Sequence, residues 1–312
     1  MKLTYVFCTY NRAERLPALV AAMRAQQCTV PFEILAVDNN SSDSTQAMLQ
    51  RLASEPGVPM RIVLEKTQGI VPARNRAIEE SLGSDILVFV DDDELPHPGL
   101  LDAACHAILN EGADCVGGRI SVDFSPHVRP TWLDNDIVGF LGELDYGPSA
   151  LWVRDGSTPL WSGNIAYRTS VFRDDVSLRF DQRYNREGAD VGGGEDAAMF
   201  HTFLARGAKI RYRPDMVVSH YVEGWRLTRR YFLKLHYRAG LRQGQYQSAD
   251  FPNKIFGVPP FLATQFLHQC GKVLAKQIKG EAGVLRQAMN AANALGTIVG
   301  YRRRPPACGC PP

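Results

Sequence analysis

The chain has 312 residues, of which 45% are hydrophobic and 22% are charged, as in an ordinary soluble globular protein. This length allows one large α/β domain or two smaller ones, and the composition excludes a disordered chain, a collagen-like fibre and a disulfide-dense scaffold. No stretch reaches the roughly 18 uninterrupted apolar residues of a membrane-spanning helix. Met1 and Lys2 lead directly into a strand-like run, so we expect a cytoplasmic protein without a signal peptide.

The net charge of +2 is unevenly distributed. Residues 223–304 contain 14 Lys and Arg against 3 Asp and Glu, which leaves a net charge of −9 on the rest of the chain. A basic region of this kind indicates either an anionic partner, such as a lipid surface or a phosphorylated substrate, or a solvated helical face. The seven cysteines are irregularly spaced, and Cys308 and Cys310 would offer zinc only two of four ligands, so we expect reduced thiols.

The first 120 residues alternate between strand-like and helix-like segments. Strand-like runs occupy 3–8, 32–37, 61–64, 86–90 and 114–120, and helix-like stretches occupy 13–25, 44–52, 71–82 and 99–110. Apolar strands alternating with helices are typical of a doubly wound, mostly parallel α/β sheet. Ligands of such sheets bind at the carboxyl ends of the strands, so the residues that follow each strand are the candidates for function.

The second part of the chain is less regular. We interpret residues 121–160 as loops, with a binding lobe as a hypothesis. A helix is expected at 195–205 and a strand at 216–221. Beyond residue 226 the pattern predicts helices, broken at Pro252 and at Pro259.

Four consecutive acids follow the strand at 86–90, namely Asp91, Asp92, Asp93 and Glu94. Like charges in such a run repel one another unless a cation neutralises them. Alternate side chains point the same way, so Asp91 and Asp93 could converge on one ion. Oxygen ligands favour Mg²⁺ or Mn²⁺, which would bridge to a phosphate-bearing ligand. The alternative is a solvated acidic loop that caps the next helix.

Short polar residues also follow the first two strands. Thr9, Tyr10, Asn11 and Arg12 come after one strand, and Asp38 to Asn40 come after the next. Such side chains can bind a base or a ribose, although capped turns are an equally good interpretation.

Two further segments could contact a bound ligand. Arg74 follows Gly69 near the start of a helix and could meet a diphosphate, or it could be a surface arginine. Trp161, Gly163 and Asn164 could line a sugar pocket, with core packing as the alternative.

Three glycines, at 192–194, precede Glu195 and Asp196 at the start of a predicted helix. The helix dipole favours an ionised Asp196, which could act as a general base, whereas ordinary helix capping is the alternative. His220 ends an apolar strand and is either a metal ligand or a buried core histidine.

Taken in order, six segments resemble the family 2 glycosyltransferases, which are inverting enzymes of the GT-A fold that use nucleotide-diphospho-sugars. The segments are FCTYNRAERL, AVDNNSSDST, QGIVPARNRAI, FVDDDELP, SGNIAYR and GGGEDAAMFHTFLARG. The resemblance covers about residues 1–225 and implies a GT-A catalytic domain there, with a nucleotide-binding half at about 1–120 and an acceptor half at 121–225. A helical, basic extension would follow at 226–312.

The resemblance also implies roles for the candidate residues. Thr9 and Asp38 match contacts to the base, and Arg74 matches a basic residue near the base and diphosphate. Asp93 matches the direct metal ligand of a DxD element, with Asp91 nearer the ribose, and His220 matches a further metal or diphosphate contact. Asp196 matches the general base, with Glu195 less favoured. The full set of expected donor-binding residues is Thr9, Tyr10, Asn11, Arg12, Asp38, Asn40, Gly69, Arg74, Asp91, Asp92, Trp161, Gly163 and Asn164.

These matches predict metal-assisted transfer of a sugar, with UDP as the family's commonest carrier, to a hydroxyl of a glycan or lipid-linked acceptor. A nucleotidyltransferase and a catalytically decayed sugar-nucleotide-binding protein are the alternatives, and no nucleic-acid-binding module is recognisable. The chain lacks the QxxRW motif of the family's processive synthases, which points to transfer of one or a few sugars. Lys272, Lys276 and Lys279 lie at helical spacing, which is typical of a helix on an anionic bilayer or packed against a partner. We therefore also expect peripheral association with the inner face of a membrane.

Overall fold

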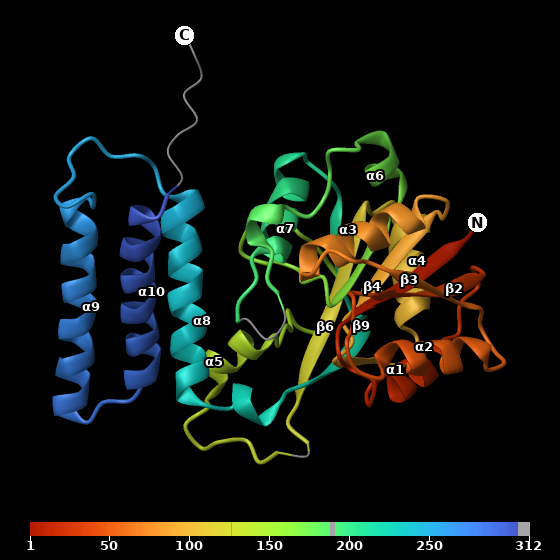
Figure 1. Ribbon diagram of the computed structural model, residues 1–312, viewed down its shortest axis with the longest axis horizontal. Helices are drawn as coiled ribbons and strands as arrows, with labels where there is room; N and C mark the ends of the chain where they lie inside the picture. The colour runs from red at the N-terminus through yellow and green to blue at the C-terminus, as the bar shows by residue number, and fades with distance from the viewer. Residues whose placement is uncertain (126, 188–190, 305–312) are drawn as a thin grey trace, which may run out of the picture. The chain divides into compact units, whose positions relative to one another are not determined.

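The computed structural model describes residues 1–125, 127–187 and 191–304, and these form two compact units (Figure 1). Within the described residues, the first unit contains 1–187 and 194–222 and the second contains 191–193 and 223–304. The first unit is an α/β sheet domain and the second is helical. Cys308 and Cys310 lie outside the described residues.

The sheet of the first unit has nine strands among the described residues, in the order β3-β2-β1-β4-β8-β6-β9-β5, with β7 paired to β9. The bounds are β1 Leu3–Thr9, β2 Phe32–Asp38, β3 Met60–Leu64, β4 Ile86–Val90, β5 Glu94–Pro96, β6 Cys115–Asp123, β7 Leu151–Trp152, β8 Asn164–Arg168 and β9 Ile210–Tyr221. The first four strands in this order are mutually parallel, whereas β8 runs antiparallel to both β4 and β6.

The parallel strands are apolar because helices cover both of their faces. All five residues of β4 are buried, as are six of the seven residues of β1. In Figure 1, α1 and α2 lie on one side of these strands and α3 lies on the other. The helices of this unit are α1 Leu16–Arg24, α2 Thr45–Ser54, α3 Ile70–Ser81, α4 Leu100–Leu109, α5 Asn135–Val138, α6 Ser170–Asp174 and α7 Glu195–Ala205, with short turns η1 Gly139–Leu141 and η2 Gln182–Tyr184.

The helical unit consists of η3 Gly224–Arg226, α8 Arg229–Arg242, η4 Gln243–Gln247, α9 Pro260–Lys279 and α10 Val284–Arg302. In Figure 1, α10 lies between α8 and α9. Four glycines let α10 approach the α8–η4 segment very closely, because a Cβ atom at any of them would lie less than 3.0 Å from a backbone oxygen of the facing segment. They form two pairs spaced four residues apart, Gly240 with Gly244 and Gly296 with Gly300.

The predicted fold class is confirmed: the first unit is a mixed α/β domain and the C-terminal part is helical. Among the described residues, no helix is long and apolar enough to cross a bilayer. Residues 121–160 contain mostly loops, as the sequence indicates, with only short elements between β6 and β8.

The glycine contacts predict that alanine substitution at two helical glycines will change the free energy of unfolding in different ways. Gly296→Ala would place its Cβ against the backbone oxygen of Tyr237, so α8 and α10 must separate, and we expect a loss of about 1–3 kcal/mol of unfolding free energy. Gly271→Ala on α9 is the matched control, because nothing lies within 4 Å of its Cβ position. Alanine there should stabilise the helix slightly. Urea denaturation followed by circular dichroism measures both, and equal stability of the two variants would contradict the close contact.

Candidate active site

The candidate polar residues lie side by side at the carboxyl ends of three neighbouring parallel strands. Thr9 and Asp38 are register partners at the ends of β1 and β2, and both are buried. Asp91 directly follows β4, which pairs with β1 on its other side. The sheet therefore places these three residues, which are far apart in the sequence, at a common edge, where ligands of such sheets bind.

Asn39 ties the loops behind this edge together. Its side-chain Nδ2 donates to the carbonyl of Thr67 at 2.7 Å, and its Oδ1 accepts a hydrogen bond from the backbone N–H of Gly69 at 2.8 Å. Gly69 has a φ of 128°, and a Cβ there would clash with the side-chain amide of Asn185. Asn39 therefore fixes the start of α3, which carries Arg74; the sequence placed Asn39 among the polar residues after the second strand but assigned it no such role.

The other loop residues mainly hold the edge in shape. Asn11 has a φ of 53°, and its Oδ1 accepts from the backbone N–H of Ser42 at 2.8 Å, which joins the loops after β1 and β2. Asn40 is exposed with a φ of 59°, and Tyr10 is partly exposed beside Asn11. The backbone N–H of Arg12 donates to the hydroxyl of Thr45 at 2.9 Å.

The acidic run after β4 is divided among different partners. Asp91 bonds Arg74, the Asp92 carboxylate lies 4.0 Å from the Arg12 guanidinium, and Asp93 lies 3.5 Å from His220. Burial, together with the adjacent Asp93 charge, raises the pKa of Asp92 to about 7, and Arg12 offsets part of that rise. Burial likewise raises the pKa of Glu94, with Asp91 and Asp93 adding to the effect. Asp92 and Glu94 are therefore protonated more readily than exposed carboxylates.

Arg74 connects two parts of the site. It is 1% exposed, and its guanidinium donates to Asp91 at 2.9 Å, to Glu195 at 3.2 Å and to Asp196 at 2.5 Å. Burial disfavours the charged form, but the three carboxylates, Asp196 foremost, outweigh burial and raise the pKa of Arg74 above its ordinary value. The interpretation of Arg74 as a surface arginine is therefore wrong: it is a buried cation that joins the end of β4 to the start of α7.

Glu195 and Asp196 differ in their access to solvent. The Glu195 side chain is 2% exposed, whereas that of Asp196 is 25% exposed. Burial, with the Asp196 charge adding to it, raises the pKa of Glu195, and Arg74 partly opposes this. Both residues occupy the first turn of α7, where the helix dipole favours negative charge. Of the two, Asp196 is the one that a substrate can reach.

Pairing between β5 and β9 brings His220 to Asp93, because Glu94 is the register partner of His220. The His220 Nε2 lies 3.5 Å from an Asp93 carboxylate oxygen, and both side chains are largely buried. Among the described residues, no group of three or more His, Cys, Asp or Glu side chains is arranged to hold a metal ion. Asp93 and His220 are thus a pair of donors, while the carboxylate of Asp91 is turned toward Arg74.

The segment before β8 supports the sheet. Asn164 is 1% exposed, and its Nδ2 donates to the carbonyls of Met216 at 2.8 Å and Arg119 at 2.9 Å, across the irregular register between β6 and β9. A Cβ at Gly163 would lie less than 3.0 Å from the Glu94 carboxylate, and Trp161 packs against the core. Contacts of these residues to a sugar remain predictions.

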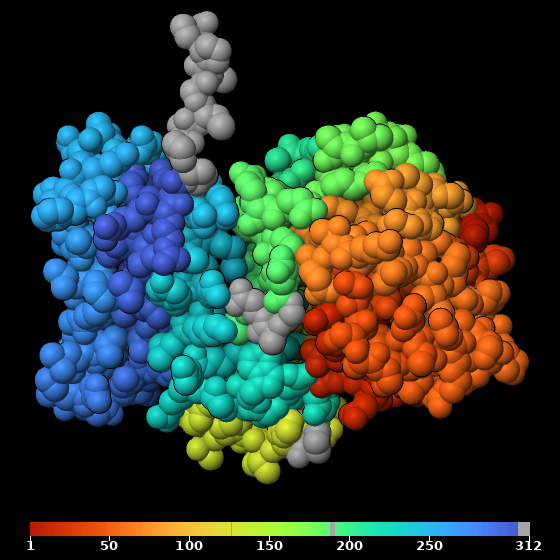
Figure 2. All heavy atoms as spheres, in the orientation of Figure 1, coloured from red at the N-terminus to blue at the C-terminus, as the bar shows by residue number. Residues whose placement is uncertain are grey.

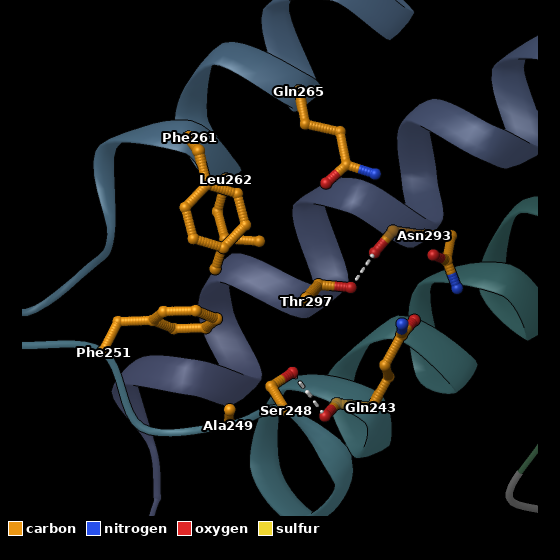
Figure 3. A pocket seen from close by; sticks show the side chains of 9 residues that line it. All are labelled: Gln243, Ser248, Ala249, Phe251, Phe261, Leu262, Gln265, Asn293 and Thr297. Atoms are coloured by element: carbon orange, nitrogen blue, oxygen red, sulfur yellow. Dashed lines mark hydrogen bonds between the residues drawn. The ribbon is translucent and has the colours of Figure 1, made fainter.

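A separate pocket of about 270 Å³ lies within the helical unit (Figure 3). Phe251, Phe261 and Leu262 form its apolar lining, and Gln243, Gln265 and Asn293 contribute side-chain amides. None of its described lining residues is titratable. The titratable candidate residues lie instead near the carboxyl ends of the strands of the sheet.

Known proteins resemble this chain in sequence and in fold. The family model described as glycosyl transferase family 2 matches residues 4–175. The chain belongs to this family.

Curated relatives match part of the family region. Glycosyltransferase AglE of Haloferax volcanii is 33% identical over 118 residues, which are 37% of this chain and 38% of that protein. An undecaprenyl-phosphate 4-deoxy-4-formamido-L-arabinose transferase of Serratia proteamaculans is 33% identical over 119 residues, 37% of this chain and 36% of the relative. The matches thus span less than two fifths of the relatives' length.

A solved structure extends the likeness in fold. The mannosyltransferase PcManGT from Pyrobaculum calidifontis, in complex with GDP-Man and Mn²⁺, superposes with a TM-score of 0.55 at 19% identity. The superposition covers 96% of this chain and 73% of that one. At this identity the likeness speaks for the fold alone.

The buried arginine generates a stability prediction with a defined pH dependence. Arg74→Met keeps the bulk but leaves three carboxylates without their common cation, which should cost about 3–5 kcal/mol at neutral pH. In the folded protein, burial raises the pKa of Glu195 and Arg74 limits that rise. Removal of Arg74 should therefore raise this pKa further and destabilise the folded protein when Glu195 is ionised. Protonation removes that penalty, so the cost should shrink as the pH falls from about 7 to about 5.

Arg76→Met on the same helix is the control, because Arg76 is 41% exposed and pairs with Glu80 at 2.8 Å. We expect its cost to stay below about 1 kcal/mol at both pH values. Urea denaturation at each pH provides the comparison. Similar stabilities for the two variants would show that Arg74 does not hold the site together.

Proposed function

We propose that this protein is an inverting glycosyltransferase that moves a sugar from a nucleotide-diphospho-sugar to an acceptor hydroxyl. The observation that carries the proposal is the accessible carboxylate of Asp196, held in the first turn of α7 and joined through buried Arg74 to Asp91 at the nucleotide edge of the sheet. In such an arrangement a base and a donor-binding carboxylate share one rigid connection. Family membership supports the reaction class.

In the proposed mechanism, Asp196 takes the proton of the acceptor hydroxyl as that oxygen attacks the anomeric carbon from the face opposite the leaving group. The Asp196 carboxylate lies in the first turn of α7 and pairs with the Arg74 guanidinium, and both features favour negative charge there. Once Asp196 is protonated, Arg74 still has Asp91 and Glu195 as partners, so its buried charge is not left unpaired. The site can thus accept the proton without losing its internal ion pairs.

On the donor side, Thr9 and Asp38 would bind the base and Asp91 the ribose. The two strand ends are register partners, so their polar atoms lie close enough to bind one small ring system. We expect uridine, although the structurally similar mannosyltransferase is a complex with GDP-Man, so the base has to be measured.

A divalent cation fits the residues after β4. Mg²⁺ and similar ions are commonly held by one or two protein carboxylates together with substrate phosphates, so a complete protein cage is not needed. Asp93 and His220 would provide the protein donors. Such an ion would stabilise charge on the departing nucleoside diphosphate.

We propose that the first unit carries catalysis, within residues 1–225, and that the helical extension from 226 serves the acceptor or a surface. The relative in Serratia proteamaculans is named for an undecaprenyl-phosphate substrate, which supports a lipid-linked acceptor here. A nucleotidyltransferase would instead release diphosphate, and a decayed protein would bind the donor without turnover.

Asp196→Asn tests the base. Loss of general base catalysis should lower kcat by about 10²–10⁴-fold while nucleotide binding is preserved. Asp174→Asn, an exposed acid at the end of α6, is the control and should leave both unchanged. Steady-state transfer assays and calorimetric nucleotide titration provide the two readouts. Full activity of Asp196→Asn would refute the base assignment, and would point to an acceptor, such as a phosphate, that is already ionised at neutral pH.

A thermal-shift panel tests the donor and the cation. UDP, GDP, dTDP and CDP are each added with and without Mn²⁺ to the wild type, Asp93→Ala and the control Asp174→Ala. We expect UDP with Mn²⁺ to stabilise the wild type and the control by about 2.7 kcal/mol at 100 times its Kd. Asp93→Ala should lose the metal-dependent part. Stabilisation that is independent of Mn²⁺ would remove the cation from the proposal.

A further inference from the structure

Helix α9 has one packed side and one side exposed to solvent. Leu262 is 6% exposed, whereas Leu267, Leu274 and Ile278 are 67%, 60% and 76% exposed. Spacings of seven and four residues place these three side chains on one side of the helix. In Figure 2 the light-blue atoms of α9 meet the dark-blue atoms of α10 on one side and border open space on the other. Large aliphatic side chains repeated in this way on an exposed helix mark a contact surface.

The same helix is exclusively basic. Residues 260–279 contain Lys272, Lys276 and Lys279 and no acid. Glu281, just beyond the helix, contacts Lys276 at 3.2 Å and Lys279 at 3.8 Å, and so reduces the net charge at that end without cancelling it. Lys272 and Lys279 lie seven residues apart, on a different flank from the aliphatic stripe. The exposed surface therefore has an aliphatic stripe bordered by a basic row.

A tight turn just before α9 presents two more apolar side chains. Ile255 and Val258 exchange backbone hydrogen bonds of 2.9 and 3.0 Å around Phe256 and Gly257. Phe256 has a φ of 50°, a conformation that bulky residues rarely adopt, and its side chain is 92% exposed. Ile255 is 61% exposed. Phe256 thus combines a strained backbone with an exposed aromatic ring. Such a combination is typical of a residue that serves binding rather than folding.

We propose that the α9 face, defined as Ile255, Phe256, Leu267, Lys272, Leu274, Ile278 and Lys279, binds the surface of an anionic phospholipid bilayer. A helix with an apolar side and flanking lysines lies in the interface plane, with its aliphatic side chains in the acyl boundary and its ammonium groups among the phosphates. No described helix is apolar enough to span the bilayer, which fits a surface-bound geometry.

Charge favours this occupant over a second copy of the chain. A symmetric contact through α9 would offer its lysines no acid from the facing helix, because residues 260–279 contain none. A bilayer that contains acidic lipids offers the opposite charge and an apolar phase together. The proposal goes beyond sugar transfer and does not depend on it.

Vesicle flotation of the full chain tests the proposal without donor or acceptor, so its failure is distinct from failure of the proposed activity. The probes are vesicles of phosphatidylcholine alone and an equimolar mixture of phosphatidylcholine and phosphatidylglycerol. We expect salt-sensitive binding to the mixed vesicles only. Replacing Lys272 and Lys279 together by Gln should weaken binding by about fivefold per lysine.

Apolar contributions are separated by matched variants. Ile278→Gln combined with Leu274→Gln should weaken vesicle binding by at least about tenfold. Leu295→Gln, on α10 and 39% exposed, is the control and should bind as the wild type does. Phe256→Gly suits the positive φ, so it should keep or improve thermal stability while weakening binding, which a purely structural role for Phe256 would not produce.

Three outcomes would overturn the proposal. These are no binding of the wild type to the mixed vesicles, equal binding to phosphatidylcholine alone, and α9-face variants that bind as the wild type does. Sedimentation equilibrium provides a fourth such outcome. If the wild type is a dimer and Leu274→Gln is a monomer, the α9 face binds a second copy of the chain instead. A monomer that floats with the mixed vesicles, and loses this property in the α9-face variants, supports it.

Discussion

The buried guanidinium of Arg74 is the interaction on which the site depends. A cation that is 1% exposed requires negative partners, and its three partners come from two distant parts of the chain, the end of β4 and the first turn of α7. Removal of any one partner would leave a buried charge less well matched. The ion pairs of Arg74 therefore hold the start of α7 beside the end of β4. The loop that contains Gly69 positions α3 so that Arg74 can make these contacts.

Charge balance also explains why the two acids of α7 differ. Glu195 is buried beside Arg74, and its raised pKa shows that its ionised form is poorly compensated. Asp196 shares the same guanidinium but retains contact with solvent. In the proposed mechanism, Asp196 would therefore receive the reacting proton, while Asp91 would keep Arg74 paired. The two adjacent carboxylates would thus take different roles, because only Asp196 is partly exposed to solvent.

The sequence predicted the strand ends well, because each apolar run stops where the buried sheet stops. Thr9, Asp38 and Asp91 lie at the common edge for that reason. Arg74 was interpreted either as a surface side chain or as a phosphate contact, because its three partners lie up to 122 residues away and no local pattern reports them. The side-chain hydrogen bonds of Asn39 could not be predicted either, although its position directly after β2 marked it as a candidate site residue.

The two units use charge in opposite ways, and this bears on what each can do. The acids of the candidate site in the sheet unit lie at buried or partly buried positions, beside Arg74 or His220. In the helical unit, the glycine pairs bring α8 and α10 into backbone contact, and α9 keeps one side open. Residues 260–279 contain no acid, and the single Glu281 beyond the helix is shared by Lys276 and Lys279. The net charge of +2 thus combines an excess of Lys and Arg in residues 223–304 with an excess of Asp and Glu in the rest of the chain.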